Sequence, residues 1–133
     1  MRYRLTIETK REEMKDITRT VADCIKQSGI EDGICTVYCP HTTAGVTINE
    51  NTDPDVKNDL LFALNKTYPD RAEFRHAEGN SAAHLKASVI GSSVTIMIDD
   101  GEPVLGTWQA VYFAEFDGPR SRRFTVKVMG SRG

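Results

Sequence analysis

The sequence predicts an α+β domain with a largely antiparallel or mixed β-sheet, two main helices and one short helix. Three observations indicate this class: segments where apolar and polar residues alternate, segments with apolar residues at helical spacing, and glycine- or proline-containing turns between neighbouring strands. The length of 133 residues suits one core, so residues 1–133 are expected to form a single domain.

The first fifty residues predict three strands and one helix. Residues 2–9 alternate cleanly, as half-buried strands do. Apolar residues recur at helical spacing over residues 17–25, with Asp16 before them as a plausible N-cap and a glycine after them as a natural stop. Residues 33–39 and 45–49 are rich in β-forming residues and predict two further strands.

Two more helices are expected in the middle of the chain. Asp53 as N-cap and Pro54 at the first helical position predict a second helix. Its buried face is expected to consist of Val56, Leu60, Leu61 and Leu64. A short helix is predicted from Ser81, as its N-cap, to a stop at Gly91. Residues 68–80 between the two helices show no period, which is typical of a functional loop or lid.

The last forty residues predict mostly strand. Residues 94–98 alternate, and Asp100–Gly101 offers a hairpin turn. A long strand is expected over residues 104–116, followed by a turn at 117–120 and a strand over 124–128 that closes the sheet. Hairpin turns between alternating segments favour antiparallel pairing.

Composition excludes several classes of protein. Nineteen acidic and seventeen basic side chains give a net charge of −2, so nothing draws the whole protein to nucleic acid or to anionic lipid. No apolar run approaches the roughly 18 residues of a membrane span, and the N-terminus lacks the apolar core of a signal peptide. Three cysteines, an odd count, argue against a secreted disulfide framework, so a cytoplasmic protein with reduced thiols is expected.

The chain has only three histidines, and each lies in an irregular, polar segment. His41 follows a predicted strand, His76 lies in the long loop, and His84 lies in the first turns of the short helix. Three imidazoles can bind zinc and leave a fourth position for water or substrate. Taken alone, each is better explained by an ordinary role: His41 could bond a turn, His76 could be a solvated loop residue, and His84 could fill a partly buried helix position. Taken together, they predict a shared polar site assembled by folding.

Residues suited to anion binding lie beside these histidines. Gly79 and Asn80 precede the helix at Ser81, where free backbone N–H groups can bind a phosphate or carboxylate. Thr42 and Thr43 can add hydroxyl groups. An ordinary helix cap and ordinary turn bonding are the alternatives.

Several other side chains are candidates for chemistry. Glu50 and Glu78 are candidate acid/base groups, with a solvated surface acid as the alternative. Cys39 and His41 share a strand face at i and i+2, so a Cys–His pair is geometrically possible. A basic cluster near the C-terminus can grip a phosphate, form a subunit contact or remain a solvated face. It consists of Arg120, Arg122 and Arg123.

Long, ordered blocks resemble the YjbQ family over about residues 14–128. They read "HTTAGVTINEN", "EGNSAAHLKAS" and "GTWQAVYFAEFDGPR". Members are often labelled secondary thiamine-phosphate synthase. The resemblance places the family's signature histidines on His41, His76 and His84 and its acid on Glu50. Ala83 stands where another histidine or small residue is often expected, which leaves the number of ligands open.

The resemblance implies a YjbQ-like α+β domain with a mixed sheet, assembled as a homotrimer with a polar cleft near subunit contacts. The label implies joining a phosphorylated thiazole to a pyrimidine diphosphate with loss of pyrophosphate, although the (β/α) repeat of a barrel enzyme is missing.

We therefore expect an enzyme acting on a small phosphorylated metabolite. The expected catalytic residues are His41, Glu50 and His84; the ligand-binding residues are Thr43, Asn80 and Ser81; and the ligands of zinc or another divalent metal are His41, His76 and His84. The alternative is a non-catalytic metabolite-binding or regulatory trimer.

Overall fold

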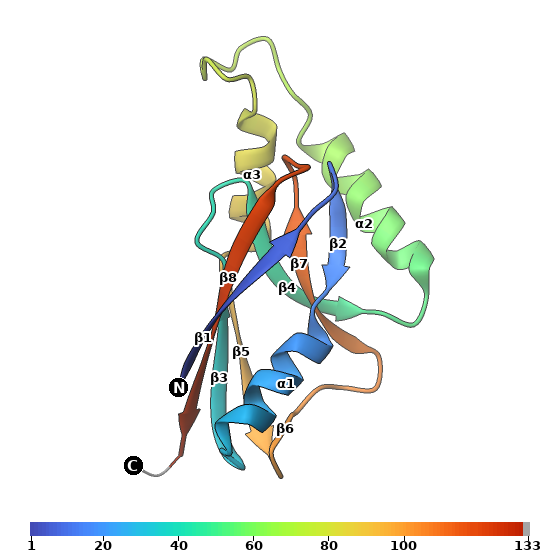
Figure 1. Cartoon of the computed structure of the whole chain (residues 1–133). Coiled ribbons are helices and arrows are strands. Elements are labelled where there is room, and N and C mark those ends of the chain that lie inside the picture. The colour runs from blue at the N-terminus through green and yellow to red at the C-terminus, as the bar shows by residue number, and fades with distance from the viewer. Residues whose placement is uncertain (132–133) are drawn as a thin grey trace.

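Two antiparallel β-sheets and three helices make up the part of the chain that the computed structural model describes, residues 1–131 (Figure 1). One sheet has five strands in the order β1-β8-β3-β5-β6, and the other has three in the order β2-β7-β4. The strands are β1 Arg2–Glu8, β2 Glu13–Asp16, β3 Asp32–Tyr38, β4 Ala44–Glu50, β5 Ser93–Asp99, β6 Glu102–Pro103, β7 Gln109–Glu115 and β8 Ser121–Gly130. The helices are α1 Thr18–Ser28, α2 Pro54–Thr67 and α3 Ser81–Ile90. The predicted α+β class is confirmed, and all strand pairings within residues 1–131 are antiparallel.

Strand β7 divides the core in two because both of its faces are buried. Val111 and Phe113 join the cluster that contains the inner face of the five-stranded sheet and helix α1. Tyr112 lies on the opposite face, with apolar residues of β2, α2 and α3. Side chains alternate along a strand, so one strand can supply both clusters. The apolar run of residues 110–114 therefore marks a strand buried on both faces.

The predictions for strands were right in kind and wrong in three places. Strand β2 was not predicted, because its four residues carry too short a pattern. The long strand expected over residues 104–116 is wrong at its start. A turn interrupts it, in which the N–H of Gln109 bonds the carbonyl of Gly106 at 3.1 Å. Strand β8 does not close the sheet but lies between β1 and β3.

The predictions for helix ends and turns hold where the signal is local. The Asp53 carboxylate accepts from the N–H of Asp55 at 2.9 Å and caps α2, as predicted. Asp100 and Gly101 have φ values of 52° and 75°, which suits the two-residue turn between β5 and β6.

Two N-cap predictions are one residue off. Ile17 rather than Asp16 is the N-cap of α1, and Asn80 rather than Ser81 is the N-cap of α3. The predicted inner face of α2 is only half-buried.

Helix α3 is held at its C-terminal end and at its middle. At Gly45 on β4 the backbones approach so closely that a Cβ atom would lie 2.5 Å from the carbonyl oxygen of Gly91. The buried ammonium of Lys86 donates to the Glu12 carboxylate at 2.9 Å and also to Asn65. These contacts hold α3 against β4, against α2 and against the segment before β2, and they thereby position His84 on the helix.

Three irregular segments lie with helix α3 toward the upper part of the molecule in Figure 1. They are the β3–β4 loop, the long loop before α3 and the turn between β7 and β8. No helix among residues 1–131 is long and apolar enough to cross a membrane.

Candidate functional site

All three histidines line one cavity of about 320 Å³, here called the histidine pocket. The β3–β4 loop, the long loop, α3 and the start of β8 supply its walls, so residues far apart in sequence meet there. The lining residues are Pro40, His41, Thr42, Thr43, His76, Glu78, Asn80, His84, Arg120 and Arg122. A second hollow of about 440 Å³ shares His41 and His84 with it and has a less polar wall that includes Ala44 and Ala87.

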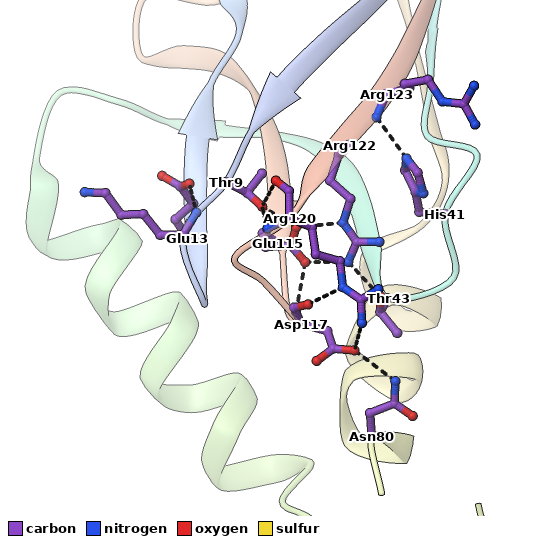
Figure 2. Close-up of polar contacts among 11 residues, drawn as sticks. Thr9, Glu13, His41, Thr43, Asn80, Glu115, Asp117, Arg120, Arg122 and Arg123 are labelled. Carbon is purple, nitrogen blue, oxygen red and sulfur yellow. Dashed lines mark hydrogen bonds and ion pairs between the residues drawn. The ribbon is translucent and has the colours of Figure 1, made fainter. Parts of the chain in front are cut away.

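The imidazole of His41 is held in one orientation by the neighbouring strand. Its Nε2 accepts a hydrogen bond from the backbone N–H of Arg123 on β8 at 2.9 Å (Figure 2). Burial, and next the charge of the Arg122 guanidinium, lower the pKa of His41 below its ordinary value. An accepting Nε2 carries no proton, so His41 is neutral and carries its proton on Nδ1.

His76 and His84 form a second unit of the pocket. Their rings meet edge to face, with centroids 5.4 Å apart. Nε2 of His76 lies 3.8 Å from the Glu78 carboxylate, and these side chains are 41% and 73% exposed. The long loop therefore contacts α3 through His76 and adds an exposed acid, Glu78, to the lining of the pocket.

Behind the pocket lies a buried ion pair between Arg122 and Glu115. Nε and Nη2 of Arg122 donate to the two carboxylate oxygens of Glu115 at 2.7 and 2.6 Å, and Nη2 also donates to the Thr43 hydroxyl at 2.7 Å (Figure 2). The Thr9 hydroxyl and the N–H of Asp117 complete the hydrogen bonds to the carboxylate. Burial raises the pKa of Glu115, but these bonds outweigh it and the pKa lies below its ordinary value. The hydrogen bond with Glu115 raises the pKa of Arg122.

A second arginine is held at the rim of the pocket by Asp117. Nε of Arg120 donates to the Asp117 carbonyl at 2.7 Å, and Nη2 donates to its carboxylate at 3.0 Å. The Asn80 amide donates to the same carboxylate at 2.9 Å. Because Asn80 is engaged there, its side chain does not cap α3. Its Oδ1 is buried and has no partner among the described residues.

The structure brings together most, but not all, of the predicted site residues. The three histidines line the pocket with Thr43 and Asn80. Ser81 is the first residue of α3 and does not line it. Glu50 ends β4, seven residues after Thr43 of the pocket, and the six residues from Ala44 to Glu50 alone correspond to roughly 20 Å of strand. Within one chain Glu50 is thus remote from the histidines, and its catalytic role stays a prediction.

A metal site is not formed by these side chains within one chain. Among residues 1–131, no group of three or more His, Cys, Asp or Glu side chains is arranged to hold a metal ion. Nε2 of His41 is already engaged by a backbone N–H, and two guanidinium groups lie on the pocket wall. This donor set does not fit tetrahedral zinc without rearrangement or a second chain, and zinc stays a prediction.

Cys39 lacks the surroundings that a nucleophilic thiol needs. The side chain is buried, and burial is the main cause of a pKa that lies above the ordinary value for a thiol. Reactive cysteines need the opposite, a stabilised thiolate that solvent can reach. The geometry therefore does not support a Cys39–His41 pair.

Sequence reasoning did not identify Thr9, Glu115 and Asp117 as parts of this site. One signal was available: Glu115 is a single acid within the apolar run "AVYFAEF". An acid that the strand pattern places among buried residues needs a partner, and here the partner is Arg122.

Known proteins resemble this chain over nearly its whole length. The family model described as UPF0047 protein YjbQ-like matches residues 3–131. A UPF0047 protein of Methanocaldococcus jannaschii is 53% identical over 133 residues, which cover 99% of this chain and 96% of that protein. The UPF0047 protein YugU of Bacillus subtilis is 54% identical over 123 residues, which cover 92% and 93%.

Solved structures show the same fold. A crystal structure from Clostridium acetobutylicum, described as an uncharacterized conserved protein of the YjbQ/UPF0047 family, has a TM-score of 0.90 and 50% identity and covers 97% of this chain and 99% of its own. A protein of unknown function from Sulfolobus solfataricus has a TM-score of 0.93 and 30% identity and covers 98% and 97%. The family match includes every segment that forms the histidine pocket. The resemblance predicted from the sequence motifs is confirmed, and the chain belongs to the YjbQ (UPF0047) family.

Proposed function

We propose that this protein is an enzyme acting on a small phosphorylated metabolite whose phosphoryl group binds in the histidine pocket. One observation carries the proposal: three imidazoles and two guanidinium groups, from segments far apart in sequence, line a single cavity of about 320 Å³. Guanidinium groups and fixed N–H donors are the usual partners of phosphoryl oxygens.

The residues divide into binding and proton-transfer roles. Arg122, held by Glu115, and neutral His41, held by Arg123, are fixed donors for phosphoryl oxygens. His84 lies between the pocket and the less polar hollow, next to His76, and is the candidate general acid or base. The less polar hollow is suited to the organic part of the metabolite.

Binding is tested first with inorganic phosphate and pyrophosphate, by isothermal titration calorimetry. The wild type is expected to bind, and His41→Ala and Arg122→Met are expected to weaken binding at least about tenfold, since each removes a fixed donor. Asp23→Asn on α1, which lines a different cavity, is the control with unchanged binding. Equal binding by all four proteins would reject the site.

Catalysis is tested separately, with a panel of phosphorylated substrates. The thiamine-phosphate-synthase type of reaction is included, with pyrophosphate release measured from a phosphorylated thiazole and a pyrimidine diphosphate. Turnover that is lost in His84→Ala would support an enzyme. If His84 is the general acid or base, the pH profile of kcat must also change in His84→Gln.

The second candidate function is a non-catalytic metabolite-binding or regulatory trimer that uses the same pocket. The position of Glu50 favours this non-catalytic function. Because Glu50 lies away from the pocket within one chain, Glu78, which is exposed, is the one carboxylate among the pocket's described lining residues that could act as a base. This candidate predicts tight binding with no turnover on any substrate. Light scattering of the purified protein tests the trimer, and metal analysis of the same sample tests zinc.

A further inference from the structure

A buried carboxylate stands directly behind the histidine pocket without lining it. Glu115, the last residue of β7, is 0% exposed and is not among the lining residues. Its two oxygens accept four hydrogen bonds, from the Thr9 hydroxyl, the N–H of Asp117, and Nε and Nη2 of Arg122. With its acceptor sites filled from the residue after β1, from β8 and from the β7–β8 turn, the carboxylate has one fixed orientation.

Arg122 connects the fixed carboxylate of Glu115 to the pocket, because it bonds Glu115 and also lines the pocket. The edge of the guanidinium formed by Nε and Nη2 faces Glu115, and Nη2 also reaches the Thr43 hydroxyl. Nη1 has no hydrogen-bond partner among residues 1–131. Arg122 and Thr43 both line the pocket. Because Glu115 occupies the Nε–Nη2 edge in a bidentate contact, the N–H groups of Nη1 are the donors left to meet a ligand.

We propose that Glu115 is a positioning residue of the histidine pocket, which acts through Arg122 and Thr43 to fix the donors that meet a phosphoryl group. The inference rests on the proposed function, since it assigns a role within the same site. Sequence analysis assigned no role to this residue.

Glu115 affects the affinity of the pocket for an anion in two opposite ways, and this makes the proposal testable. Its negative charge lies beside the pocket and opposes anion binding. Its hydrogen bonds hold Arg122 in place and favour anion binding. If Glu115 were only a counter-charge, its neutralisation would strengthen phosphate binding. If Glu115 positions Arg122, its neutralisation weakens binding even though the pocket becomes more positive.

The first experiment measures binding of inorganic phosphate to Glu115→Gln by calorimetry. Glutamine keeps the shape, but it can accept through one oxygen only, and its NH₂ group opposes the N–H groups of Arg122. Phosphate binding is expected to weaken at least about tenfold. Unchanged or tighter binding would overturn the proposal. The control Asp23→Asn removes the same charge far from the pocket and is expected to bind as the wild type does.

A second comparison separates positioning from a general structural role. In the Arg122→Met background, adding Glu115→Gln is expected to weaken phosphate binding no further, since Glu115 reaches Thr43 only by way of the Arg122 guanidinium. A further loss of the same size as in the wild-type background would overturn the proposal.

If Glu115→Gln does not fold, Thr9→Val replaces it. This variant removes the 2.6 Å bond to Glu115 and is expected to weaken binding about two- to fivefold; no loss counts against the proposal.

A ligand-free measurement keeps this inference distinct from the proposed function. The NMR signal of the Arg122 Nε–H is expected to be slow to exchange in the wild type and in Asp23→Asn, and to exchange fast in Glu115→Gln. If the wild type binds no phosphate, the proposed function fails, while this signal still decides whether Glu115 fixes Arg122. An equally protected signal in Glu115→Gln would reject the positioning role.

Discussion

The imidazole of His41 and the backbone N–H of Arg123 share a hydrogen bond of 2.9 Å, although the two residues are 82 positions apart in sequence. Since Nε2 is the acceptor, the bond exists only while His41 is neutral. The bond joins the β3–β4 loop to β8, so the protonation state of the His41 imidazole is coupled to the packing of these two segments in the pocket wall.

This relationship predicts a loss of stability in mild acid. The pKa of His41 in the folded protein lies below its ordinary value of 6.5, so the unfolded chain binds a proton more readily than the folded one. The free energy of unfolding therefore falls as the pH drops below about 6.5 towards the lower folded value. Replacing His41 with glutamine is expected to reduce this fall, as measured by urea unfolding at about pH 7.5 and about pH 5.5. Thr42→Ser, a neighbouring change without a titratable group, is the control and keeps the wild-type fall.

Breaking the Arg122–Glu115 pair is expected to cost far more than a surface salt bridge would. Arg122→Met leaves a fully buried carboxylate without its cation, so the free energy of unfolding is expected to fall by about 3–5 kcal/mol at neutral pH. Adding Glu115→Gln removes the unpaired charge and should recover part of that loss. Chemical denaturation of the single and double variants measures both values. A double variant no more stable than Arg122→Met would contradict this account.

The close approach of β4 to the end of α3 predicts a severe effect of a single methyl group. In Gly45→Ala the new Cβ would lie 2.5 Å from the carbonyl oxygen of Gly91 and 3.1 Å from Cγ2 of Ile90. Either β4 or the chain at the end of α3 must shift, and the expected cost is about 1–3 kcal/mol. Gly106→Ala is the matched control, because its Cβ would meet only the flexible side chain of Gln109 at 3.3 Å. Thermal unfolding compares the two, and equal midpoints would refute the steric explanation.

The three cysteines are expected to be nearly inert in the folded protein. All three are free and buried. Burial, and next Cys24, raise the pKa of Cys35 from 9.0 to about 11, which leaves about a hundredfold less thiolate at neutral pH. Ellman's reagent should therefore react very slowly with native protein and label three thiols after denaturation. Rapid labelling of Cys39 in the native protein would show that its thiol is accessible and would reopen the Cys39–His41 pair.

Local sequence signals predicted the features of this protein that depend on a few adjacent residues. The Asp53 cap, the Asp100–Gly101 turn and the alternation of β1, β3 and β5 each depend on neighbours within one element. Motif blocks also identified the family, because residue order alone carries that information. One boundary failed because a contact from another element decides it: Asn80 gives its amide to Asp117 rather than to α3. The start of the long strand failed for a local reason, since Gly106 and Gln109 form a turn that the β-forming residues around them concealed.

Only the tertiary structure decided how the candidate site is built. The sequence indicated that three histidines could share a site, but not that two guanidinium groups share it with them or that Glu115 supports one of these from behind. It also grouped Glu50 with His41, whereas the length of β4 separates Glu50, its last residue, from His41, which lies in the loop before it. Spacing along a chain defines faces of a helix or strand, while the meeting of β7, β8 and the loops depends on how two sheets pack, and no local pattern encodes that packing.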